Sequence, residues 1–163
     1  MSDIVHLFFI ILLVIVGMVA YFLVINALFG GRVTRIRSAA QSMPGRSLGV
    51  GFVNFLFFAV IALALLSVAE NMGPFLRGIL TIPALLILAF LAIILSLGLA
   101  GMTTLVGERL FPDLPAWTQT LWGTVCVSLA CALPFVGWFL LFPYISFVGI
   151  GAVILGLIQR EKL

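Results

Sequence analysis

The chain has 163 residues, of which 64% are hydrophobic and only 8% are charged, and its formal net charge is +3. Soluble domains carry about 25% charged residues, because polar groups must cover a surface that faces water. The composition therefore excludes a water-soluble globular domain. It predicts an all-α protein, a polytopic transmembrane bundle of about five helices that forms a single domain over residues 1–163.

The first apolar run extends from Val5 to Phe29 and predicts a helix over residues 5–29. At about 1.5 Å per residue it is long enough to cross a hydrocarbon core of about 30 Å. The residues before it include no Lys or Arg, and the run exceeds the apolar region of a secretory signal peptide. We therefore expect it to remain as a membrane anchor.

A basic segment follows, and it predicts an amphipathic helix over residues 33–43 that lies in the membrane interface. Its apolar positions share one helical face: Val33, Ile36, Ala40 and Met43. Its other sides carry three arginines, Arg32, Arg35 and Arg37. These arginines either set the topology alone or also bind anionic lipid headgroups or a partner. Nucleic-acid binding is not expected, because the membrane accounts for the positive charge.

Two further apolar runs predict helices over residues 48–68 and 79–106, with a polar connector over residues 69–78 between them. The last run, residues 121–158, would form a rod of about 57 Å, nearly twice the hydrocarbon thickness. Proline and glycine in residues 133–138 predict a break. We expect helices over residues 117–134 and 138–158, as a tight hairpin or a re-entrant pair.

Charge placement favours five crossings with the N-terminus outside and the C-terminus in the cytoplasm of a bacterial inner membrane. This topology leaves only Arg77 outside and places the other basic residues of the connections and C-terminus inside, in agreement with the positive-inside rule. Trp117 and Trp138 are then expected at the two membrane interfaces, where tryptophan is enriched.

Several polar and small residues are candidates for helix packing. Asn26 and Asn54 have similar predicted depths, so a hydrogen bond between them is expected. Small side chains recur every four residues in one helix and as a glycine pair in the last: Thr124, Ser128, Ala132, Gly149 and Gly151. Such positions allow neighbouring helices to approach closely.

No set of residues predicts catalysis, a metal site or a cofactor. No charged residue lies inside the five predicted spans, His6 is the only histidine, and Cys126 and Cys131 are not spaced as metal ligands. Any pigment or haem near this chain would be held mainly by partners. We therefore expect no enzymatic activity and no bound cofactor.

Short motifs resemble a bacterial polytopic membrane domain of unknown function that is found attached to bactofilin-like, polymer-forming proteins. The motifs are Arg32 with Arg35, then residues 44–48, 81–83, 107–110 and 133–138, and finally residues 149–152. The resemblance covers about residues 29–157 and implies a bacterial inner-membrane setting. The chain lacks a β-helical polymer-forming module, and the resemblance supplies no catalytic residues.

Three functions are consistent with these observations. The first is a non-catalytic accessory or structural subunit that packs against other transmembrane subunits of a larger complex, for example a photosynthetic or other energy-transducing one. The second is a small oligomeric channel or carrier, and the third is a membrane anchor for a cytoskeletal or envelope-organising partner. Other transmembrane chains and anionic lipids are the expected partners.

Overall fold

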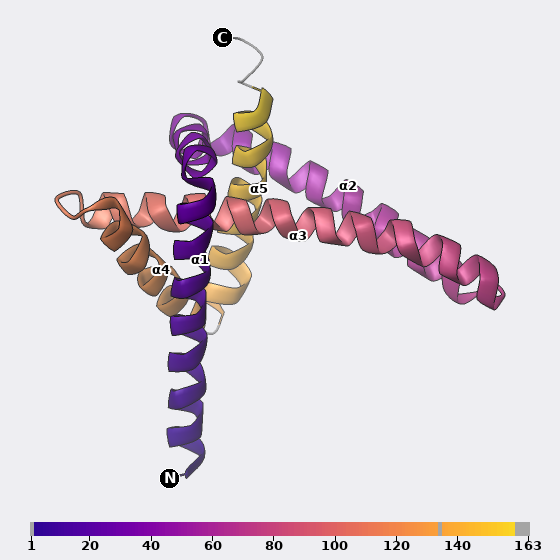
Figure 1. Cartoon of the computed structure of the whole chain (residues 1–163), viewed down its shortest axis with the longest axis horizontal. Coiled ribbons are helices and arrows are strands. Elements are labelled where there is room, and N and C mark those ends of the chain that lie inside the picture. The colour runs from indigo at the N-terminus through magenta and orange to yellow at the C-terminus, as the bar shows by residue number, and fades with distance from the viewer. Residues whose placement is uncertain (1, 134, 159–163) are drawn as a thin grey trace.

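The computed structural model describes residues 2–133 and 135–158, and every regular element in those residues is a helix (Figure 1). The elements in chain order are α1 (Ser2–Ser42), α2 (Pro44–Glu70), α3 (Pro74–Leu110), α4 (Ala116–Ala132), the π-helix η1 (Val136–Leu141) and α5 (Phe142–Ile158). This confirms the predicted all-α helical bundle. Within the described residues, four helical segments are long and apolar enough to cross a membrane: α1, α2, α3 and the continuous η1–α5 segment.

Helix α1 is longer than expected, because it includes the basic segment instead of ending before it. Its backbone leaves helical geometry at Phe29 (φ −123°, ψ 26°), next to Gly30 and Gly31. Glycine is a common site of helix kinks. The kink turns the last part of α1 across the end of the bundle that carries the C-terminal end of α5 (Figure 1).

The position of residues 33–43 differs from the expected one. Their apolar face packs against the protein's own core, because Val33 is 2% exposed, Ile36 is 4% exposed and Ala40 is 3% exposed. A segment lying on lipid would instead keep this face against the membrane. The amphipathic pattern thus correctly predicts a helix. The apolar face of this helix packs against other helices of the protein rather than against lipid.

Helices α2 and α3 form an antiparallel hairpin that extends beyond the rest of the molecule (Figure 1). Pro44 and Pro74 each occupy the first turn of their helix, where the missing N–H costs no hydrogen bond. Both helices consequently begin earlier than predicted, and the turn between them is shortened to residues 71–73. Pro83 lies inside α3. We call the outer part of the hairpin, residues 56–89, the α2–α3 arm.

The predicted break in the last apolar run is present. Helix α4 ends at Ala132, and the next helical turn begins at Val136. Phe135 has a positive φ of 69°, which L-residues rarely adopt, so the chain reverses there without glycine. Pro134, the predicted end of this helix, lies outside the described residues. Helix α4 has 17 residues and is about 26 Å long, slightly less than a hydrocarbon core.

The helices on the two sides of this break, α4 and α5, separate more than those of a tight hairpin would. Helix α4 packs on α3 and α1, whereas α5 packs on α2, α3 and α1. Helix α5 is consequently the most enclosed helix: 44% of the most apolar stretch of η1–α5 is buried, compared with 6% of that in α1. The main core forms around α5, with Ile94 and Met102 from α3 and Val148 and Ile150 from α5.

Candidate functional site

Glycines allow α5 to contact the backbones of α2 and α3 directly. A Cβ atom on Gly149 would lie 2.8 Å from the carbonyl carbon of Gly98 in α3, closer than real Cβ contacts. On the other side, Gly151 lies against the carbonyl oxygen of Ser47 and Gly51 lies against that of Phe147. Gly149 and Gly151 are thus at close helix crossings, and replacing either one requires a backbone to move.

A second close crossing joins α3 and α4, and the sequence analysis missed it. Gly107 lies against the backbone of Gln119, and Gly123 lies against the backbones of Thr103 and Gly107. Thr103 and Gly107 are four residues apart, a spacing of small residues that is typical of helix interfaces. That spacing was the available sequence signal.

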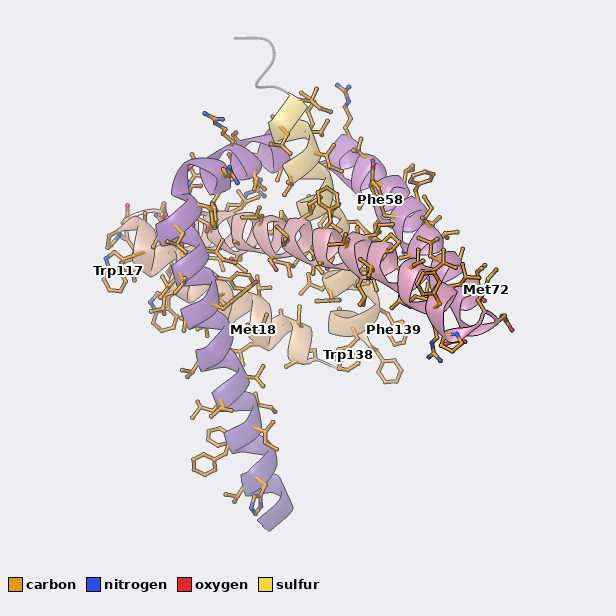
Figure 2. The ribbon with its side chains drawn as sticks, turned by 45° about the vertical axis from the view of Figure 1, so that its right-hand side comes forward. Met18, Phe58, Met72, Trp117, Trp138 and Phe139 are labelled. Atoms are coloured by element: carbon orange, nitrogen blue, oxygen red, sulfur yellow. The ribbon has the colours of Figure 1, made fainter. Side chains whose placement is uncertain are left out.

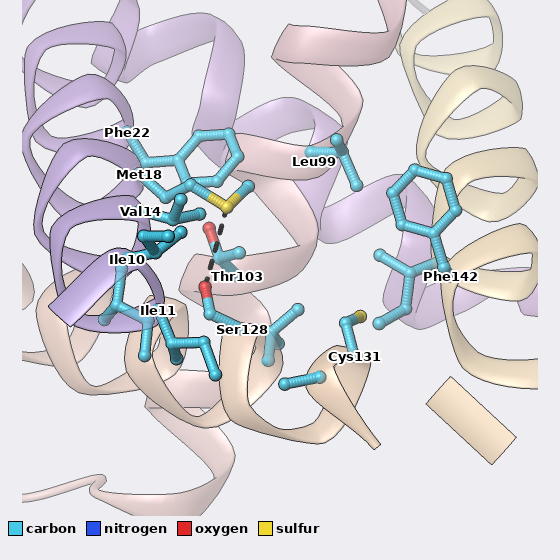
Figure 3. Close-up of a pocket in the computed structure, with 14 residues that line it drawn as sticks. Ile10, Ile11, Val14, Met18, Phe22, Leu99, Thr103, Ser128, Cys131 and Phe142 are labelled. Atoms are coloured by element: carbon cyan, nitrogen blue, oxygen red, sulfur yellow. Dashed lines mark hydrogen bonds between the residues drawn. The ribbon is translucent and has the colours of Figure 1, made fainter. Parts of the chain in front are cut away.

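The small-residue positions predicted in α4 have different environments. Thr124 is fully buried and donates a hydrogen bond to the Thr120 carbonyl at 2.7 Å. Ser128 is half-buried and donates to the Met18 sulfur of α1 at 3.7 Å (Figure 3). Ala132 is exposed at the end of the helix. The stripe therefore contacts other helices at its first two positions.

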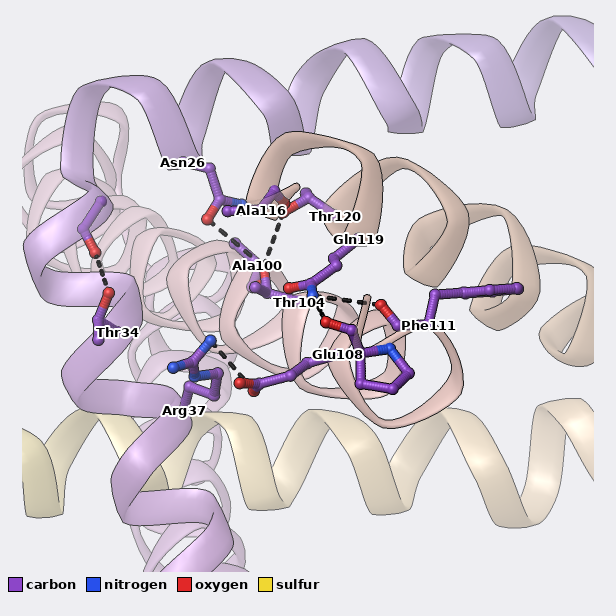
Figure 4. Close-up of polar contacts among 12 residues, drawn as sticks. Asn26, Thr34, Arg37, Ala100, Thr104, Glu108, Phe111, Ala116, Gln119 and Thr120 are labelled. Carbon is purple, nitrogen blue, oxygen red and sulfur yellow. Dashed lines mark hydrogen bonds and ion pairs between the residues drawn. The ribbon is translucent and has the colours of Figure 1, made fainter. Parts of the chain in front are cut away.

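Polar side chains from three helices meet between α1, α3 and α4 (Figure 4). Thr104 donates to Asn26 Oδ1 at 3.4 Å, and its hydroxyl also lies 3.3 Å from that of Thr120. The Asn26 amide itself donates to the Phe22 carbonyl at 3.0 Å. This set, Asn26, Thr104 and Thr120, is called the polar cluster below.

The expected hydrogen bond between Asn26 and Asn54 does not form. Asn54 donates to the Val50 carbonyl of its own helix at 2.8 Å. Helix α1 packs on α3, α4 and α5 and makes little contact with α2. The two asparagines have similar predicted depths but lie on helices that are not packed neighbours, so the prediction of this bond was wrong.

The polar cluster borders a groove of about 600 Å³ that is also lined by Arg37, one partner of an ion pair. Asn26, Thr34, Arg37, Thr104 and Thr120 contribute its polar lining. Arg37 Nη1 lies 3.1 Å from Glu108 Oε2, and both side chains are about one third exposed (Figure 4). The ion pair links the basic end of α1 to the C-terminal end of α3.

The remaining interface candidates lie on the outside of the molecule. Arg32 and Arg35 are exposed, and neither makes an ion pair within the described residues. Trp117 is 63% exposed at the start of α4, and Trp138 is 71% exposed in η1, beyond the other end of α4 (Figure 2). The separation of the two tryptophans is consistent with positions at two membrane interfaces.

An apolar cavity of about 270 Å³ lies between α1, α3, α4 and α5 (Figure 3). Its lining is mostly aliphatic and aromatic, including Ile10, Leu99 and Phe142; side-chain oxygen or sulfur atoms come from Met18, Thr103, Ser128 and Cys131. No group of three metal-ligating side chains occurs in the part of the chain that the structure describes. The cavity is suited to a hydrocarbon chain or an apolar side chain rather than to a reacting substrate.

Comparison of the chain with protein-family models, curated proteins and solved structures found no match. The geometry described above is therefore the basis for the function proposed below.

Proposed function

We propose that this protein is a non-catalytic integral membrane subunit that packs against other transmembrane chains of a larger bacterial inner-membrane complex. The α2–α3 arm carries this proposal, because two long apolar helices extend away from the core with most of their outer surface unused by the protein itself. The four spanning segments support a multi-pass membrane protein.

The arm has small side chains between its two helices and large side chains on its outer faces. Ala62 and Ala84 are completely buried, so small residues line the seam between its two helices. The outer faces carry large side chains, including Phe57, Ile82 and Leu86, each at least 60% exposed. The two helices of the arm pack closely together, and their large outer side chains form an apolar surface. Such a surface can pack against neighbouring helices by van der Waals contacts within a membrane.

The arrangement of the ends supports the proposed topology. The backbones of Gly156 in α5 and Arg35 in α1 are neighbours, because a Cβ on Gly156 would lie 3.8 Å from the Arg35 carbonyl carbon. The Arg37–Glu108 ion pair brings the end of α3 to the same side. The basic segment and the ends of α3 and α5 thus share one end of the molecule, which we assign to the cytoplasm by the positive-inside rule.

Sizing after solubilisation in mild detergent tests this proposal. The wild-type protein should elute as a complex larger than a monomer in its detergent micelle. The Ile82→Ala/Leu86→Ala variant should lose that complex, because it removes two exposed side chains from one face of the arm. Leu13→Ala, which truncates an exposed residue of α1, is the matched control and should retain it. A wild-type monomer would contradict the proposal.

A small oligomeric carrier is the second candidate, and the groove beside the polar cluster favours it. A groove of about 600 Å³ with an amide, three hydroxyls and a guanidinium can accommodate a small polar solute. Flux of small polar solutes into proteoliposomes tests this function. It requires a wild-type flux that falls in Asn26→Val and is unaffected in Asn54→Val; no flux above empty liposomes would exclude it for the solutes tried.

A further inference from the structure

We propose that Arg32 and Arg35 form the headgroup end of a binding site for one anionic phospholipid, whose two acyl chains lie in two adjoining apolar grooves on α3. This inference is independent of the subunit function proposed above. It concerns a bound lipid, not a protein partner.

Two grooves meet beneath Arg32. The first, of about 220 Å³, lies between the basic part of α1, the middle of α3 and the end of α5. The second, of about 320 Å³, lies between α1 before its kink and the same part of α3. Arg32, Ile93 and Leu97 border both grooves. The two grooves therefore begin at one arginine and continue as separate apolar channels.

The lining of each groove matches a hydrocarbon chain. Phe90, Ile94 and Leu157 line the first groove below Arg35, and no acidic side chain among the described residues lines it. Ile25 and Ala92 line the second, together with Tyr21 and Ser96. The Tyr21 hydroxyl donates to Ser96 Oγ at 2.8 Å, and Ser96 Oγ in turn donates to the Ala92 carbonyl. Both hydroxyl groups thus donate their hydrogen bonds within the protein.

The charges at the head of the grooves are available for a phosphodiester. Arg37 pairs with Glu108, but Arg32 and Arg35 have no carboxylate partner within residues 2–133 and 135–158. The Arg32 guanidinium lies 5.4 Å from the centre of the Phe29 ring, which holds it beside the kink by a cation–π contact. Guanidinium groups bind phosphate oxygens with paired hydrogen bonds, so two of them favour an anionic over a zwitterionic headgroup.

The kink at Phe29 is what assembles this site. A straight α1 would carry Arg35 and Ile36 away from α3. In the kinked helix, Ile36 packs against the Gly101 backbone position of α3, where a Cβ would lie 2.7 Å from Ile36 Cγ2. The two arginines are thereby held above the grooves, where their charges attract anionic lipid headgroups.

Native mass spectrometry of the full chain, purified and reconstituted in nanodiscs of mixed phosphatidylglycerol and phosphatidylcholine with identical acyl chains, tests the proposal. The wild-type protein should retain one phosphatidylglycerol in preference to phosphatidylcholine. Arg32→Gln/Arg35→Gln should lower that preference about 25-fold, since each arginine near an anionic lipid contributes a factor of about five. Arg32→Gln alone should lower the preference about fivefold, and Arg46→Gln is the charge-matched control for this single variant, because Arg46 is exposed but borders neither groove.

A further variant distinguishes lipid binding in the two grooves from nonspecific attraction between the arginines and anionic lipids. Ile93 is 61% exposed and borders both grooves, so Ile93→Trp should fill their junction without disturbing the core. It should reduce retention of phosphatidylglycerol while all arginines remain. Equal retention in wild type and the double arginine variant, a loss in Arg46→Gln equal to that in Arg32→Gln, or no loss in Ile93→Trp would each overturn the proposal. Helical circular dichroism of each variant checks that the fold is retained.

Discussion

The two ends of α2 show how the same kind of apolar helix can be used inside and outside one protein. Its first half contacts the backbone of α5 through Ser47 and Gly51, which are both buried. Its second half belongs to the α2–α3 arm, where only alanines in the seam are buried. Hydropathy is high in both halves. The difference lies in residue size: small residues mark where this protein packs on itself, and large ones mark where lipid or another chain covers it.

The largest expected effect is at the buried contact between α5 and α3. Gly149→Leu should lower the free energy of unfolding in detergent by at least about 3 kcal/mol, because the new side chain meets the Gly98 backbone. Gly17→Leu in α1 meets no atom within 4 Å and should leave thermal unfolding unchanged or raise the midpoint slightly. Equal destabilisation by both substitutions would refute the distinction between the two regions.

The polar cluster should contribute less than the glycine contacts. Thr104→Val removes the contacts with Asn26 and Thr120 together with the bond to the Ala100 carbonyl of its own helix. It should cost about 0.6 to 1.7 kcal/mol, the average and the maximum measured for hydrogen bonds between membrane helices. Asn54→Val, which removes only a bond within one helix, should cost less. Chemical unfolding in mixed micelles measures both, and a larger loss for Asn54→Val would contradict the observed pairing.

The ion pair between Arg37 and Glu108 should contribute still less to the free energy of unfolding. Arg37 and Glu108 are partly exposed, so solvent screens their attraction, and the coupling energy should be below about 1 kcal/mol. A double-mutant cycle with Arg37→Gln and Glu108→Gln isolates this energy. Salt should weaken it further, whereas a coupling of several kcal/mol that is insensitive to salt would indicate that the pair is enclosed by a partner.

The smallest effect on the isolated protein is expected at the arm. Ile82→Ala/Leu86→Ala should change the free energy of unfolding in detergent by less than about 0.5 kcal/mol, because both side chains face away from the protein. The same variant should abolish the larger assembly. A strong loss of stability in the purified monomer would mean that these side chains support the arm itself rather than a partner.

The sequence predicted what depends on composition, length and local breaks. The membrane class follows from the apolar content, and the break near Phe135 follows from a run too long for one span. The partner of Asn26 could not be predicted, because periodicity gives a face of a helix but not the helix it contacts. Gly107 and Gly123 were missed for a related reason: the crossing exists only after α3 and α4 are brought together.

The burial of residues 33–43 illustrates the same limit. The pattern of Val33, Ile36 and Ala40 is the same for a helix on lipid and for one on protein. The kink at Phe29 decides between these environments, because it directs the segment across α3 and α5. In consequence, the lipid site that we infer uses the two exposed arginines of this segment and not its apolar face.

Site-specific photo-cross-linking in native membranes is the most direct test of the central claim that the arm binds another transmembrane chain. A benzophenone side chain at Leu86 should form a discrete adduct with a second membrane polypeptide, and one at Leu13 should form much less of it. Adducts with lipid alone at Leu86, with no protein adduct at any irradiation time, would contradict the account.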